Sequence, residues 1–167
     1  MKELRIIAIA CLAVLLQWGF IQELPMSRFG NPYIYLWVFL VLPFNTSKFN
    51  NYLYAFVLGS IIDGLEQSGG AHTVASLAMV FAKPYIENVL YGFKDGKSDE
   101  GLIHLPLPNF ITQTTVLVLL HHTVLYFMEN SGVNHTSELV LRTLVSTALT
   151  IFLLSIGHLL FSRKYAA

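Results

Sequence analysis

The sequence has few charged residues and a single cysteine. Only 12% of its 167 residues are charged, compared with about 25% in an ordinary soluble domain. Cys11 has no second cysteine to pair with, which excludes a disulfide within the chain, and we expect its thiol to be packed in the core. A formal net charge of zero offers no basic surface for nucleic acid. A soluble domain and a nucleic-acid-binding protein are therefore both disfavoured.

The few charged residues are separated by long uncharged, largely apolar stretches. The chain is 54% hydrophobic, with a mean hydropathy of +0.59. No Asp, Glu, Lys or Arg occurs in the windows 6–22, 29–47, 49–62, 67–82, 101–128 and 143–162. A helix needs roughly 17–25 apolar residues to cross a bilayer. These windows predict an all-α integral membrane protein with about six transmembrane helices in a single domain, residues 1–167.

The lysines and arginines predict how the chain is oriented in the membrane. With a cytoplasmic N-terminus, most of them lie inside, namely Lys2, Arg5, Lys48, Lys83, Lys94, Lys97, Arg163 and Lys164. Only Arg28 and Arg142 lie outside. Cations concentrate in cytoplasmic loops. Both termini are therefore expected in the cytoplasm, and the turn at Gly69 and Gly70 is expected on the outer face.

The second apolar segment, PYIYLWVFLVLP, is short and is bounded by Pro32 and Pro43. It has two interpretations. It is either a short tilted helix or a buried element that neighbouring helices shield, because exposed irregular backbone is not tolerated in hydrocarbon. Its Tyr33, Tyr35 and Trp37 are the residue types of an aromatic belt at a membrane interface.

Small residues recur at helical spacing on both sides of the glycine pair. The positions are Ala55, Gly59 and Asp63 before the pair, and Ala71, Ala75, Ala78 and Ala82 after it. This spacing gives each of the two predicted helices one face of small side chains. In lipid such faces mark contacts between helices, because packing supplies the driving force. We therefore expect another helix to lie on them.

Both predicted helices are short for a full crossing. At 1.5 Å per residue, the uncharged part of the helix at 52–65 covers roughly 20 Å of a hydrocarbon core about 30 Å thick. Lys83, Pro84 and Tyr85 are expected to end the following helix at an interface, with the lysine reaching towards water.

Asp63 needs either a partner or a role, because an ionisable group inside a membrane segment is costly. Arg142 lies roughly 8 Å into the last predicted helix, 137–161, at a similar depth. We therefore predict an ion pair between them; the alternative is a carboxylate held by water or an amide at a helix end. Beside Arg142, a polar stripe is formed by Thr143, Ser146, Thr147 and Thr150.

The histidines and serines do not form a recognisable catalytic or metal site. His121 and His122 are adjacent in the predicted helix 109–129, so their side chains diverge by about 100° and are not expected to share one ion. One of them is expected to be packed or bonded to a threonine. Ser60, Ser68 and Ser76 have no base placed beside them. The sequence therefore predicts no catalytic, cofactor-binding or metal-binding residue.

The central stretch resembles the rod shape-determining protein family MreD. That family has a Gly, a few apolar positions and an Asp at the end of one helix, and a Gly, a His and small residues at the start of the next. The corresponding sequences here are GSIID (59–63) and GAHTVAS (70–76). Ser60 and Gly69 stand where the family has apolar residues. The chain length and six predicted spans are also similar.

The resemblance implies a non-enzymatic scaffold of bacterial cell-wall elongation in the cytoplasmic membrane, without a cofactor. Its partner would be an MreC-type protein, linked to the MreB filament, a RodA-type glycosyltransferase and a transpeptidase. The predicted partner-binding or structural residues are Ala55, Gly59, Asp63, Gly69, Gly70, Ala71, Ala75, Ala78 and Arg142.

The alternative function is small-solute binding. The MreD fold is similar to the compact six-helix bundles of the substrate-binding components of vitamin transporters. A solute-binding protein needs several polar groups that converge on one cavity. Asp63, Arg142, Thr143 and Ser146 are the residues that could line it.

Overall fold

The computed structural model describes residues 2–21, 29–43, 46–91, 101–129 and 136–162, and every regular element in these ranges is helical. The elements are α1 (Lys2–Leu16), η1 (Gln17–Ile21), η2 (Ile34–Leu36), α2 (Trp37–Val41), α3 (Lys48–Glu66), α4 (Ala71–Tyr91), η3 (Leu102–His104), α5 (Leu107–Glu129) and α6 (Thr136–Phe161). The predicted all-α class is confirmed. Several of the cations that predict the orientation, Arg28, Lys94, Lys97, Arg163 and Lys164, lie outside the described residues.

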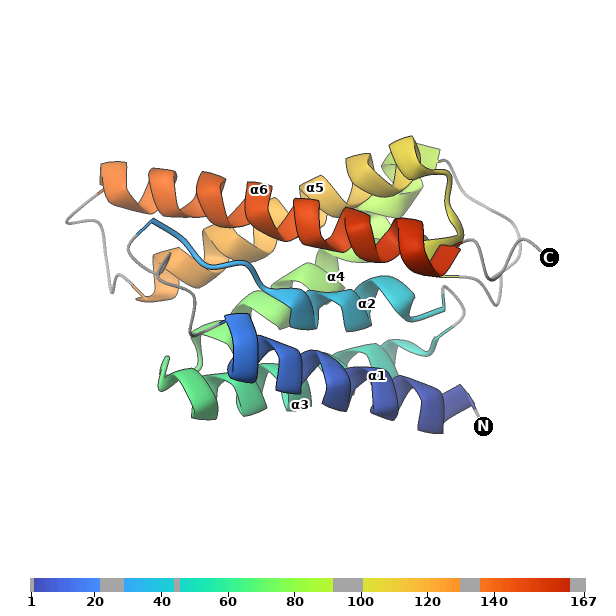
Figure 1. Cartoon of the computed structure of the whole chain (residues 1–167), viewed down its shortest axis with the longest axis horizontal. Coiled ribbons are helices and arrows are strands. Elements are labelled where there is room, and N and C mark those ends of the chain that lie inside the picture. Colours follow the sequence, from blue (N-terminus) through green and yellow to red (C-terminus); the bar gives the residue numbers. More distant parts are fainter. Residues whose placement is uncertain (1, 22–28, 44–45, 92–100, 130–135, 163–167) are drawn as a thin grey trace.

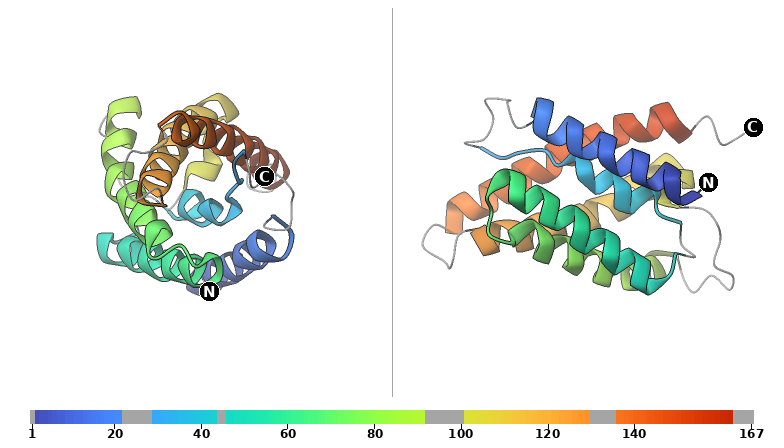
Figure 2. Two further views of the ribbon diagram at one scale, coloured as in Figure 1. Left: turned by 90° about the vertical axis from the view of Figure 1, so that its left-hand side faces the viewer. Right: turned by 90° about the horizontal axis from the view of Figure 1, so that it is seen from below.

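The long helices run side by side around α2 (Figure 1). Viewed from one end of the bundle, α1, α3, α4, α5 and α6 surround α2, which lies in the middle (Figure 2). Along this ring α3 packs on α4, α4 on α5 and α5 on α6, while α1 packs on η2 and α2.

The segment with α2 is a buried element, which confirms the second interpretation of its short apolar sequence. Tyr35, Phe39 and Leu40 have no exposed surface. The predicted aromatic belt is wrong here, because Tyr33 and Tyr35 lie inside the bundle and Trp37 packs on Phe110 and Phe161. A five-residue α-helix cannot cross a bilayer, so it lies where neighbouring helices cover it.

The extended backbone before α2 is held by the polar stripe of α6. The Asn31 N–H donates to Ser146 Oγ, and the Tyr33 N–H donates to Thr150 Oγ1, both at 2.9 Å. Both hydroxyls are fully buried. A buried N–H without an acceptor costs about as much as a lost hydrogen bond, so the stripe allows irregular backbone to lie inside the bundle.

Gln17 supplies a second set of bonds to the same backbone. Its amide nitrogen donates to the Pro32 carbonyl at 3.2 Å, and its amide oxygen accepts from the Ile34 N–H at 2.7 Å. Gln17 is the first residue of η1 and is buried. The amide group therefore makes the two hydrogen bonds that a paired β-strand would make, and it connects the start of η2 to η1 at the end of α1.

Lys83 holds the other end of the buried segment. Its ammonium group donates to the carbonyl oxygens of Phe39, at 2.9 Å, and Leu42, at 3.5 Å. A cation is favourable at a helix C-terminus. The prediction that Lys83 reaches towards water and that α4 ends there is therefore wrong. The helix continues through Pro84 to Tyr91.

α3 and α4 are also longer than the sequence predicts. α3 has 19 residues and begins at Lys48, where Ser47 Oγ accepts the Asn50 N–H at 3.2 Å. α4 has 21 residues. At 1.5 Å per residue the two helices measure roughly 28 and 32 Å, close to the thickness of a hydrocarbon core.

The bundle carries large apolar side chains on its outside, and its interior contains polar side chains beside an apolar core. Large exposed apolar residues include Phe56, Phe81, Leu144 and Phe152. Buried polar residues include His72, Ser76, Gln113, Thr114, His121 and His122. Six spans were predicted, and in the described parts of the chain two helices, α5 and α6, are long and apolar enough to cross a membrane. Cys11 is exposed on α1, so the prediction that its thiol is packed in the core is wrong.

Candidate functional site

The residues of the MreD-like motif form the hairpin of α3 and α4. Gly59 is buried against the next helix, and a Cβ atom added to it would lie 2.5 Å from Thr73 Cα and 3.1 Å from the His72 carbonyl oxygen. Only a residue without a side chain allows this approach, because real Cβ contacts are longer. The small face of α3 is therefore in contact with α4 of the same chain.

The other small residues of the predicted site lie in or beside this hairpin. Ala55 and Ala75 have no exposed surface, and Ala71 is nearly as buried. Ala78 is half-buried. The small faces are used inside the molecule, which leaves little of them for a partner helix. We expected another helix on these faces, and that helix belongs to the chain itself.

The turn between the two helices depends on left-handed backbone. Gly69 and Gly70 have φ angles of +65° and +98°, and Gln67 has a φ of +55° at the end of α3. Glycine adopts such angles at no steric cost. This turn brings the last turn of α3 back beside the first turn of α4.

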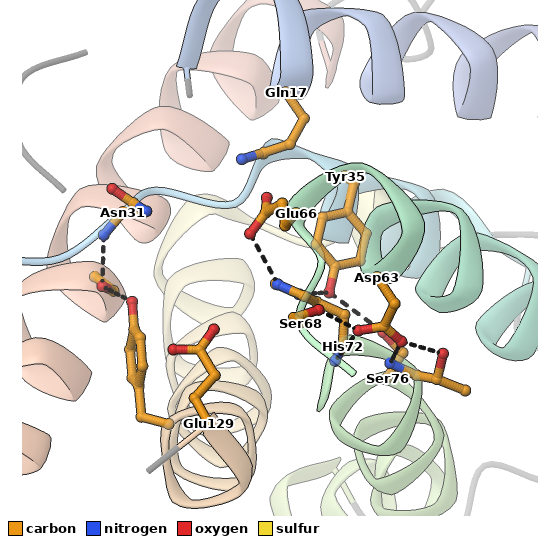
Figure 3. A network of polar contacts seen from close by, with 12 residues as sticks. Gln17, Asn31, Tyr35, Asp63, Glu66, Ser68, His72, Ser76 and Glu129 are labelled. Carbon is orange, nitrogen blue, oxygen red and sulfur yellow. Dashed lines mark hydrogen bonds and ion pairs between the residues drawn. The ribbon is translucent and has the colours of Figure 1, made fainter. Parts of the chain in front are cut away.

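Asp63 caps α4 from the preceding helix (Figure 3). Its Oδ1 accepts the His72 N–H at 2.8 Å, and its Oδ2 accepts the Thr73 N–H at 2.9 Å. The hydroxyls of Ser68 and Thr73 donate to the same two oxygens at 2.5 Å. Position 70, where a capping side chain usually stands, is a glycine. Asp63 therefore supplies the cap that Gly70 lacks.

The predicted ion pair between Asp63 and Arg142 is wrong. Arg142 lies against Glu129 instead, with 3.5 Å between Nη2 and Oε2, and its guanidinium stands 4.6 Å from the ring centre of Tyr126. Both carboxylate oxygens of Asp63 are already occupied by donors from α4 and the turn. The structural alternative, a carboxylate held by amides at a helix end, is the arrangement found.

A chain of polar contacts leads from the hairpin to the centre of the bundle (Figure 3). Glu66 Oε2 lies 3.0 Å from His72 Nε2, and His72 Nδ1 is hydrogen-bonded to the Tyr35 hydroxyl at 3.1 Å. The same hydroxyl is bonded to His121 Nε2 at 2.7 Å and lies 3.4 Å from Ser76 Oγ. Tyr35 thus ties the buried segment to both α4 and α5.

The neighbouring histidine points to another helix. His122 Nδ1 is hydrogen-bonded to Thr147 Oγ1 on α6 at 2.9 Å, which confirms that one histidine of this pair is bonded to a threonine. In the described parts of the chain, no three His, Cys, Asp or Glu side chains gather in a way that could hold a metal ion.

Ser146 on α6 makes a second hydrogen bond, to Tyr126 on α5. The Tyr126 hydroxyl is hydrogen-bonded to Ser146 Oγ at 2.5 Å, and Ser146 in turn accepts the Asn31 N–H (Figure 3). Gly30 lies against the same serine, with a Cβ position 2.5 Å from Ser146 Oγ. Three residues of the polar stripe, Ser146, Thr147 and Thr150, therefore hold other parts of the chain against α6.

Comparisons with known proteins do not place this chain in a family: no family model, curated protein or solved structure matches it.

The contacts inside the bundle involve polar residues that the sequence analysis did not assign to the site. Tyr35, Glu66, Lys83 and Gln17 were not among the predicted site residues, although each is a polar group inside or beside an apolar stretch. That incompatibility with lipid is the signal that could have identified them. Chemically, the contacts position helices, and two buried atoms of the network, His121 Nδ1 and His122 Nε2, have no hydrogen-bond partner in the described parts of the chain.

Proposed function

We propose that the protein is a non-enzymatic scaffold of bacterial cell-wall elongation, which spans the cytoplasmic membrane several times and binds an MreC-type partner. Through that partner it would connect the MreB filament to a RodA-type glycosyltransferase and a transpeptidase. The observation that carries the proposal is the hairpin: the residues that resemble the MreD motif, Gly59, Asp63 and Gly70, act together in one structural unit.

The apolar outer surface of the bundle supports the membrane location. A soluble protein buries apolar side chains and exposes polar ones. Here rings and aliphatic chains cover the outside while histidines, a glutamine and threonines are buried. Lipid tails solvate such a surface, and some of the polar groups inside are hydrogen-bonded to one another, as Tyr35 is to His121 and His122 is to Thr147. α5 and α6 are long and apolar enough to cross a membrane, and α3 and α4 match the thickness of a hydrocarbon core in length.

The filled centre favours a scaffold over a solute-binding component. Two of the residues that could have lined a solute cavity are committed to the fold, because Asp63 caps α4 and Ser146 accepts the Asn31 N–H. Thr143 is buried, and its hydroxyl has no hydrogen-bond partner in the described parts of the chain. The space at the middle of the ring is occupied by Tyr33, Tyr35 and their neighbours.

Reporter fusions test the orientation. Because cations concentrate on the cytoplasmic side, a reporter fused after Lys48 or Lys97 is expected to signal cytoplasm. One inserted at Gly70 is expected to signal the outer side. An outer signal after Lys97 would refute the predicted orientation.

Complementation and co-purification test the function. In a rod-shaped host depleted of the protein, cells are expected to become round, and the wild-type gene should restore rods. The tagged protein should retain an MreC-type protein through purification. The variant Asp63→Ala, which loses the cap of α4, should fail in both assays, whereas Glu138→Gln, which removes an exposed carboxylate from the first turn of α6, should behave as wild type.

A solute-binding component would give a different result. Depleted cells would keep their shape and lose uptake of a small molecule, and purified protein would carry that molecule instead of a protein partner. Normal rods after full depletion would refute the scaffold proposal.

A further inference from the structure

An apolar groove of about 370 Å³ runs along α1. One wall is formed by Ile9, Ala13 and Leu16 of α1, and the floor by Ile34, Trp37 and Val41 of η2 and α2. Phe161, at the end of α6, closes the far side. The groove therefore lies where α1 and α6 flank the buried segment.

The floor of the groove is the one face of residues 33–42 that is not fully covered by protein. Ile34, Trp37 and Val41 are half-buried, while every other residue in this range is buried. In a membrane, something apolar must fill the space above these three side chains, because water there would be in contact with hydrocarbon on all sides.

Positive charge lies at one end of the groove. Arg5, in the first turns of α1, is exposed and lines that end, together with His104. By the predicted topology this end faces the cytoplasm. The groove is thus apolar along most of its lining and has a cation at one end. An anionic phospholipid has the matching chemistry, with an apolar acyl chain and a negatively charged headgroup.

The dimensions fit a single acyl chain. A water molecule occupies about 30 Å³, and a methylene group is of similar size, so the groove holds about a dozen such groups. From Arg5 to Leu16 the helix rises roughly 16 Å. A helix about 10 Å across and 16 Å long occupies on the order of 1,200 Å³, more than the groove holds.

We propose that the groove binds one acyl chain of an anionic phospholipid of the cytoplasmic leaflet, with the lipid phosphate at Arg5. The chain would lie on Trp37 and complete the cover of the buried segment. This inference rests on the membrane location in the proposed function and not on the MreC-type partner.

Trp37 provides a direct test, because brominated acyl chains quench tryptophan fluorescence at short range. The variant Trp18→Phe leaves Trp37 as the only tryptophan. The purified full-length variant is placed in phosphatidylcholine vesicles that contain a small fraction of brominated phosphatidylglycerol or of brominated phosphatidylcholine. We expect the phosphatidylglycerol to be about fivefold more effective, the preference that one cation near an anionic headgroup provides.

Two charge variants locate the headgroup. Arg5→Gln in the same background should abolish the preference for phosphatidylglycerol. Lys48→Gln removes an exposed cation at the start of α3, away from the groove lining, and should leave the preference unchanged.

Each other outcome overturns the inference. Equal quenching by both lipids would mean that Trp37 meets bulk lipid only. No quenching by either lipid, in protein that floats with the vesicles, would mean that protein, such as a partner segment, covers the groove. Protein that does not float with the vesicles would refute the membrane location itself.

Discussion

Replacing Gly59 by alanine is expected to lower the free energy of unfolding by about 3 kcal/mol, the upper range for forcing atoms into a packed interior. The added Cβ would lie 2.5 Å from Thr73 Cα and 2.9 Å from the Thr73 backbone nitrogen. Backbone cannot turn away as a side chain can, so α3 and α4 would have to separate. The measurement is an SDS titration in mixed micelles followed by circular dichroism.

Gly64 is the matched control for this substitution. It lies in the same helix, and a Cβ atom added there would meet nothing within 4 Å. Alanine is a better helix former than glycine by about 1 kcal/mol, so Gly64→Ala should be neutral or stabilising. Equal effects of the two substitutions would show that α3 and α4 are not in close contact at Gly59.

Replacing Asp63 by alanine is expected to cost about 3 kcal/mol, because two backbone N–H groups at the start of α4 and two hydroxyls lose a charged acceptor. Asp63→Asn keeps the size of the side chain and one acceptor oxygen, so it should cost less, about 1–2 kcal/mol. The same SDS titration measures both variants.

The control for Asp63 is an acid that lies at the start of another helix. Glu138 is exposed in the first turn of α6, and Glu138→Gln should cost only a few tenths of a kcal/mol through the helix dipole. An Asp63→Ala variant as stable as Glu138→Gln would mean that water replaces the carboxylate as acceptor.

The sequence predicted the elements that depend on local pattern. The positions of the long helices follow from uncharged stretches, and the hairpin turn follows from Gly69 and Gly70. The extension of α4 through Pro84 was missed, because a proline removes one helix hydrogen bond but does not oblige the helix to end.

The contacts of the polar residues could not be read from the sequence, because their partners are far away along the chain. In the sequence, Lys83 has the surroundings of a lysine at a membrane interface. It caps the end of α2 only because the fold brings the Phe39 carbonyl, 44 residues earlier, within reach of its ammonium group. Likewise Asp63 and Arg142 have similar predicted depths in the membrane, but a similar depth does not determine which donors bind the Asp63 carboxylate. Asp63 is satisfied by backbone nine and ten residues away.

The buried segment has a consequence for the order of assembly during synthesis. The acceptor for the Asn31 N–H is 115 residues later in the chain, and the acceptor for the Tyr33 N–H is 117 residues later. At a bacterial synthesis rate of up to about 20 residues per second, roughly six seconds pass before α6 exists. Until then the nascent chain has no hydroxyls from α6 to offer this backbone. The native position of α2 is therefore reached only after the last helix has left the ribosome, although α2 is made among the first.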